Sequence, residues 1–158
     1  MLLGTVLLIV GFVLFTNGMN GLLGVDKKSG AIVNIMGGSL LVVINIIYIL
    51  QGDYFAAGTG FLFALTYLWI AVNGLFKVDL RPYGIFSLFV AVTTVPVALM
   101  QTDMRMMLIW AAWGVLWFSG FVETVLNKSL GKFVPIICVL IGIFTGWIPG
   151  YLMMLNMW

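Results

Sequence analysis

Histidine is absent from this chain, and cysteine occurs once, as Cys138. Because protein zinc sites are built mainly from clusters of His and Cys, such a site is excluded, and a single thiol cannot form a disulfide within the chain. The sequence also lacks HExxH, GxSxG, a phosphate-binding loop and a Gly-rich dinucleotide motif. We therefore expect a protein that is not an enzyme, with no catalytic residues, no metal and no cofactor.

Charged side chains are scarce as well. They make up 8% of the 158 residues, and hydrophobic residues make up 63%, against about 25% and about 45–50% in ordinary globular domains. The chain divides into six apolar stretches of about 20 residues, the length that spans a bilayer as a helix. These stretches lack the alternation of barrel strands. The predicted fold is an all-α membrane protein, a single transmembrane domain over 1–158. The predicted helices lie near residues 2–23, 31–51, 55–76, 83–100, 106–126 and 133–154.

The basic residues predict the orientation of these helices. Six of the seven lie in the first, third and fifth connections, and Arg105 is the exception. Because basic loops stay on the cytoplasmic side, both termini are expected outside the cytoplasmic membrane. The net charge of +2 is thus an orientation signal, and no basic patch points to a nucleic-acid partner.

A short segment is repeated along the chain. NGLLGVD (20–26) ends the first predicted helix, NGLFKVD (73–79) ends the third, and ETVLNKS (123–129) is a fainter third copy at the end of the fifth. One interpretation is a helical hairpin, running from outside to inside and back, that is used three times around a central pore, as repeats recur in transport proteins. The alternative is that short polar turns at membrane helix ends resemble one another.

The lack of charge within the spans also limits what this protein can carry. An ion path needs rings of carbonyls or charges, and a proton-coupled carrier needs a relay of acids or histidines. Glu123 is the only acid within a span. Its position near the cytoplasmic end of the fifth helix fits a helix-end role better than direct transport. The composition favours a neutral polar solute, which loses less hydration on entry than an ion does.

Three tryptophans give the strongest signal for a binding surface. Trp110, Trp113 and Trp117 lie in an uncharged segment at spacings of three and four residues, so they share one face of a helix. They extend along about 10 Å of helix, too far for all three to belong to one interfacial aromatic belt. We interpret them as the lining of a slot for a small, flat, neutral molecule, to which Trp N–H and Tyr O–H groups can donate hydrogen bonds.

Six segments carry a resemblance to known proteins: MLLGTVLLIVGFVLFTNG, GFLFALTYLW, DLRPYGIFSLFVAVTTVP, IWAAWGVLWFSGFVE, LGKFVP and WIPG. In this order and spacing they resemble the urea channel and amide transporter family (UreI/AmiS). The resemblance implies six helices per protomer as three hairpins, a pore through each protomer, and a hexamer with lipid in its centre. It also implies urea or a short aliphatic amide as the solute, moving down its gradient, and a functional link to a cytoplasmic urease or amidase.

The family's pore lining can be carried over to this chain. Its helix-one positions step by three or four residues, as one helical stripe does, although plain helix packing also produces such a stripe. The positions that the resemblance assigns to the pore are Leu3, Leu7, Val10, Leu14, Asn17, Phe63, Tyr67, Trp110, Trp113 and Trp117.

Two departures from the family pattern concern acid gating. Acid-gated members carry long, His-bearing outer loops and a glutamate in the sixth helix, whereas here the outer connections are short and Ile141 stands at the matching position. The resemblance therefore predicts a pore without a histidine gate, and Glu123 is the residue that would carry any other pH response. Two alternatives stay open: a channel preferring acetamide-like amides over urea, and a membrane scaffold subunit that transports nothing.

Overall fold

The computed structural model describes residues 2–158. Six helical spans are long and apolar enough to cross a membrane. Five of them are continuous, and the sixth consists of α6, the π-helical segment η1 and α7. The elements are α1 (Leu2–Leu23), α2 (Lys27–Leu50), α3 (Tyr54–Phe76), α4 (Arg81–Leu99), α5 (Met104–Thr124), α6 (Phe133–Ile141), η1 (Gly142–Trp147) and α7 (Ile148–Met154). The predicted all-α fold with six spans is confirmed, and no predicted boundary is wrong by more than four residues.

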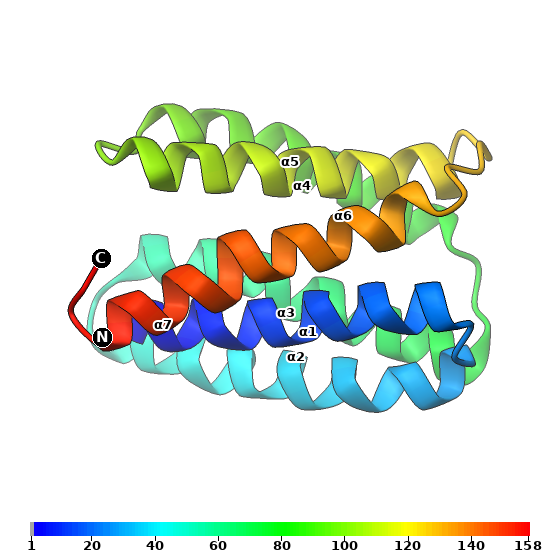
Figure 1. Ribbon diagram of the computed structural model, residues 1–158, viewed down its shortest axis with the longest axis horizontal. Coiled ribbons are helices and arrows are strands. Elements are labelled where there is room, and N and C mark those ends of the chain that lie inside the picture. Colours follow the sequence, from blue (N-terminus) through cyan, green and yellow to red (C-terminus); the bar gives the residue numbers. More distant parts are fainter. Residues whose placement is uncertain (1) are drawn as a thin grey trace.

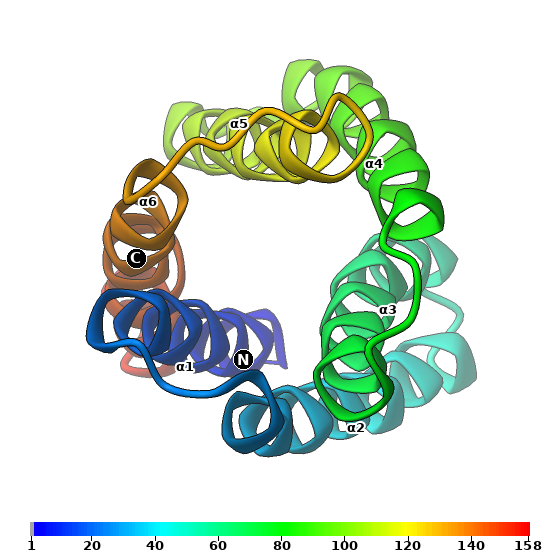
Figure 2. The same ribbon diagram turned by 90° about the vertical axis from the view of Figure 1, so that its right-hand side faces the viewer.

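The six spans stand side by side as a ring, in the order of the chain (Figure 2). The sixth span closes the ring by packing along α1. The start of α1 and the C-terminus lie at the same end of the bundle, together with the α2–α3 and α4–α5 connections (Figure 1). We call this the outer end, following the orientation predicted from the basic residues, and the opposite end the inner end.

The spans that pack most closely are not the ones joined within a hairpin of the repeat. In chain order the repeat joins the first span to the second, the third to the fourth and the fifth to the sixth. In the structure α2 packs closely along α3, α4 along α5, and α1 along the sixth span, while α3–α4 and α5–α6 touch only lightly. The closest pairs are therefore joined by the outer connections, or lie at the two ends of the chain. The reason is the distribution of small residues, which the repeat does not reveal.

Glycines permit the close approach of the sixth span to α1. Gly142, Gly146 and Gly150 form a small-residue ridge, and its partner was not predictable from the sequence. A Cβ on Gly142 would lie 2.6 Å from the Phe15 backbone nitrogen, and one on Gly150 would lie 2.6 Å from that of Leu8. Since backbone meets backbone here, only glycine fits, as in other small-xxx-small membrane interfaces.

The three copies of the repeated segment share one backbone feature. At the fifth position of each copy the chain turns with a positive φ, 69° at Gly24, 52° at Lys77 and 52° at Asn127. This left-handed conformation is common just after a helix ends, and non-glycine residues adopt it seldom. Gly52 after α2 and Asn156 after α7 adopt it as well, so the three copies end their helices in the way that other helices of this chain do.

The sixth span is the one irregular helix among the described residues. Its middle, Gly142–Trp147, is π-helical, and Pro149 follows at the start of α7. Proline has no N–H to donate to the preceding turn, and π-helical turns commonly absorb such interruptions. The π-helical turn of this span therefore lies directly before Pro149.

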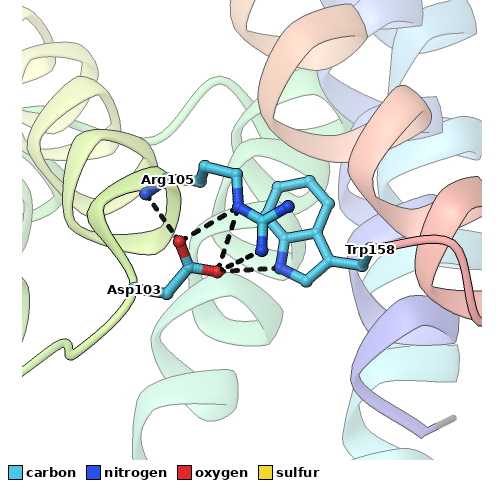
Figure 3. Close-up of polar contacts among 3 residues, drawn as sticks. All are labelled: Asp103, Arg105 and Trp158. Atoms are coloured by element: carbon cyan, nitrogen blue, oxygen red, sulfur yellow. Dashed lines mark hydrogen bonds and ion pairs between the residues drawn. The ribbon is translucent and has the colours of Figure 1, made fainter.

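A polar cluster joins the C-terminus to the outer end of α5 (Figure 3). Asp103 accepts hydrogen bonds from the Arg105 backbone N–H at 2.9 Å and from the Trp158 indole N–H at 3.1 Å. The Arg105 guanidinium bonds the same carboxylate and lies 4.1 Å from the centre of the Trp158 ring. This cluster connects the sixth span to the α4–α5 pair across the outer end of the ring.

Candidate functional site

Two cavities lie inside the ring, one toward each end. The inner cavity has a volume of about 420 Å³, and the outer cavity has a volume of about 170 Å³. Both are lined by residues from α1, α2, α3 and α5. Phe63 and Trp113 line both cavities, so these two rings form the partition between them. Each cavity has room for a molecule of a few heavy atoms.

Every residue that the sequence assigned to a pore borders one of these cavities. The set divides by depth along the bundle. The outer cavity is bordered by Leu3, Leu7, Val10, Phe63, Trp110 and Trp113. The inner cavity is bordered by Leu14, Asn17, Phe63, Tyr67, Trp113 and Trp117. The helical stripe of α1 and the tryptophan stripe of α5 thus face each other across the ring.

Aromatic rings fill the partition between the cavities. The Phe63 ring centre lies 4.6 Å from that of Trp113 and 4.7 Å from that of Trp117. Trp110 lies 4.9 Å from Trp113 in an edge-to-face arrangement. Such contacts stabilise aromatic pairs beyond simple burial. Phe63 is 5% exposed and Trp113 is 3% exposed, so the partition is closed in this conformation.

The polar atoms at the partition are already occupied by the protein. Trp113 Nε1 donates to Thr145 Oγ1 at 2.8 Å, and Trp117 Nε1 donates to Thr66 Oγ1 at 3.0 Å. Tyr67 Oη points to the Val10 carbonyl oxygen at 3.4 Å. The expectation that these Trp and Tyr groups donate to a solute is therefore wrong for this conformation, because each has a protein acceptor. A solute at the partition meets ring faces instead.

The inner cavity is the more polar of the two. Asn17 and Asn34 face each other with reciprocal amide hydrogen bonds of 2.9 and 2.7 Å. Asn20 and Asn73, which begin two copies of the repeat, and Glu123, which begins the third, also line this cavity. Glu123 accepts a hydrogen bond from the Leu130 backbone N–H at 3.2 Å. It therefore caps the α5–α6 connection, as its helix-end position predicts.

The aspartates have structural roles at the beginnings of helices. Asp26 and Asp53 accept backbone N–H groups in the first turns of α2 and α3, and Asp103 does the same for α5. Asp79 accepts the Arg81 backbone N–H at 2.9 Å and pairs with its guanidinium. Within residues 2–158, no three His, Cys, Asp or Glu side chains lie close enough to hold a metal ion. Because these aspartates and Glu123 lie at helix ends, none of them places a carboxylate at mid-depth in either cavity.

Sequence reasoning did not identify several polar residues of the site. Thr66 and Thr145 hold the two tryptophans, Asn34 pairs with Asn17, and Asn45 lines the outer cavity. A signal was present for the two asparagines on α2: they are eleven residues apart, three helical turns, and therefore share a face. A buried polar residue in an apolar span is itself a functional indication. The threonines give no comparable signal, since threonine is common in membrane helices.

The model of the AmiS/UreI family transporters matches residues 2–157. The chain belongs to this family. A curated relative, the acid-activated urea channel of Helicobacter pylori strain J99, is 38% identical, and the alignment covers 99% of this chain and all of the relative. A Mycolicibacterium smegmatis protein described as a transporter of amidate substrates is 34% identical, over 98% of this chain and 78% of the relative.

Solved structures agree with the family assignment. The Helicobacter pylori urea channel in its closed state is 40% identical and superposes with a TM-score of 0.92, covering 99% of both chains. A crystal structure of the Helicobacter pylori channel is 41% identical with a TM-score of 0.90, covering 100% of this chain and 99% of that one. With six membrane-capable helices and relatives that are channels and transporters, the chain is a multi-pass membrane protein.

Proposed function

We propose that this protein is a passive channel for urea or a closely related short neutral amide, which moves down its gradient. The observation that carries this proposal is the pair of cavities in line, separated by the Phe63 and Trp113 rings. No charged side chain lies at mid-depth in the described cavities to replace the hydration shell of an ion. A flat neutral amide loses much less hydration free energy than an ion does, and its faces can lie against the aromatic rings.

Flux of labelled urea and acetamide into proteoliposomes tests the function. We expect both to enter faster than into empty liposomes, with rates proportional to the gradient and unaffected by ionophores. Acetamide carries a methyl group where urea carries its second amino group, and a difference of this size in an apolar site is worth only about 1–3 kcal/mol. A strong preference for acetamide would favour the amide-channel alternative. Rates equal to those of empty liposomes for both solutes would favour the scaffold alternative and contradict transport.

We propose further that six copies form a ring with lipid in its centre, as the family resemblance implies. The six spans of one chain already enclose both cavities, so each copy carries its own path and the oligomer is not needed to complete it. Cross-linking in native membranes tests this assembly, and a ladder of six bands, from one copy to six, is expected. A functional link to a cytoplasmic urease or amidase that consumes the solute fits a path without energy coupling.

Both termini are expected to face away from the cytoplasm of a bacterial cell. Six of the seven basic residues lie at the inner end, and such loops remain cytoplasmic. A reporter that is active only in the cytoplasm, fused after Trp158, should stay silent, and the same reporter inserted in the α3–α4 connection should be active. The reverse pattern would overturn the orientation.

We propose that urea flux is nearly constant between about pH 7 and pH 5, because no imidazole is present to titrate there. At the outer end, hydrogen bonds from Arg105 hold the pKa of the Asp103 carboxyl below its ordinary value. A carboxyl with a lowered pKa keeps its stabilising contacts as pH falls toward its ordinary value of about 4, and loses them only below it. The Asp103–Arg105–Trp158 cluster therefore stays intact at pH 5.

Initial urea flux at several pH values in the same liposomes checks this prediction. A steep rise on acidification would contradict it. If that rise were lost in Glu123→Gln but kept in Asp53→Asn and Asp103→Asn, the sensor would lie at the inner cavity, where Glu123 is found.

A further inference from the structure

The side-chain amide of Asn45 is buried and lacks hydrogen-bond partners in the described chain. Its side chain lies on α2 in the wall of the outer cavity and is 0% exposed. Neither Nδ2 nor Oδ1 has a hydrogen-bond partner among residues 2–158. Burying an amide without partners costs free energy, and nearly all buried polar groups in folded proteins avoid it. A group that stays unpaired therefore calls for a functional explanation.

The neighbouring helix makes room for this amide. Gly60 on α3 faces it, and a Cβ at position 60 would overlap the amide, coming within 2.8 Å of Asn45 Cγ. Any other residue at position 60 would thus displace the side chain. Gly60 also lines the outer cavity. The α2–α3 contact therefore keeps Asn45 in one place at the cavity wall.

Two other polar side chains of the outer cavity, Thr59 and Gln101, already have acceptors. Thr59 Oγ1 donates to the Phe55 carbonyl oxygen at 2.9 Å, and Gln101 Nε2 donates to the Val97 carbonyl oxygen at 3.0 Å. Asn45 differs from both, because its donor and its acceptor are both uncommitted.

The inner cavity shows what such an amide can bind. There Asn17 and Asn34 form a reciprocal pair, in which each side chain donates one N–H to the oxygen of the other. A primary amide presents the same adjacent donor and acceptor. Asn45 offers half of this pair at the wall of the outer cavity, where its amide packs against Gly60 in this conformation.

We propose that Asn45 is the docking point of the outer cavity, where a primary amide solute forms a reciprocal amide pair before crossing the Phe63–Trp113 partition. This inference rests on the proposed channel function and adds the residue that recognises the solute. It explains how an otherwise apolar cavity accepts urea or acetamide, since the pair replaces two hydrogen bonds that the solute gives up on leaving water.

Asn45→Leu tests the docking point, because leucine has a similar size and no polar atom. Removing an unpaired buried amide should leave assembly intact. In proteoliposomes we expect urea and acetamide permeability to fall by about three- to tenfold, the effect of losing the hydrogen bonds to one amide. Glycerol, a neutral solute without an amide, should change by less than about twofold, because it cannot form the pair. Asn45→Ser, which keeps one weaker partner, should give an intermediate loss and decides the matter if the leucine variant does not assemble.

Ser87→Ala is the matched control. The Ser87 hydroxyl is also buried without a partner in the described chain, and it lines neither cavity, so all three permeabilities should match the wild type. An equal fall for urea and glycerol in Asn45→Leu, or no fall at all, would overturn the docking point while leaving the channel function standing. Wild-type permeability no greater than that of empty liposomes would overturn both.

Discussion

Gly146→Val is expected to abolish the folded protein. A Cβ on Gly146 would lie 2.5 Å from the Gly11 backbone nitrogen and 2.9 Å from the Leu7 carbonyl oxygen. Backbone atoms cannot rotate aside as a flexible side chain can, so α1 and the sixth span would have to separate. Overpacking typically costs about 1–3 kcal/mol and more where backbone cannot move aside, and here it falls on the contact that closes the ring. Fluorescence-detected size-exclusion chromatography of a tagged protein should show loss of the monodisperse peak.

Gly58→Val is the control for this substitution. Gly58 also lies within a helix, α3, but a Cβ there meets nothing within 4 Å. The variant should give the wild-type elution profile and thermal stability. A Gly146→Val protein that elutes and melts like the wild type would show that the contact between α1 and the sixth span yields easily, and the explanation of ring closure would be wrong.

Trp113→Ala should destroy solute discrimination. Trp113 borders both cavities, and its ring contacts those of Phe63 and Trp110. Removing it joins the cavities and deletes a face against which a flat solute passes. Since a difference of one methylene in a fitted site is worth about 1–3 kcal/mol, selectivity for urea over larger neutral solutes should fall by about tenfold. Light-scattering measurements of urea, glycerol and thiourea permeability in one set of liposomes check this.

Trp69→Ala serves as the comparison. Trp69 stacks on Phe86 with ring centres 5.7 Å apart, at the α3–α4 contact, and it borders neither cavity. It should leave selectivity unchanged. Because loss of a buried tryptophan can cost about 3–5 kcal/mol, Trp113→Leu, which keeps more volume, should accompany the alanine variant. Unchanged selectivity in both Trp113 variants would place the solute path elsewhere.

Much of this architecture was predictable from the sequence because membranes constrain helices strongly. Length and apolarity gave the six spans, and the tryptophan spacing gave a shared face that borders both cavities. Which helices pack most closely was not predicted. That depends on which glycines meet which backbone atoms, as Gly146 meets Gly11, and a repeat in sequence carries no information about those contacts.

The hydrogen bonds of the site were beyond sequence reasoning for a related reason. Trp113 and Trp117 looked like donors to a solute, but Thr145 and Thr66 accept from them across the bundle, at sequence separations of 32 and 51 residues. Conversely, nothing in the sequence indicates that Asn45 lacks a hydrogen-bond partner, because whether an amide finds a partner depends on neighbours brought near by folding.

The aromatic partition also bears on whether protons can leak across the membrane in which the protein lies. Protons cross membranes by hopping along unbroken files of water, and apolar constrictions break such files by dewetting. The Phe63 and Trp113 rings divide the interior into two separate chambers, with no carboxylate at that depth to relay a proton. The proposed urea channel would therefore pass a small solute between the rings without opening a continuous water file for protons.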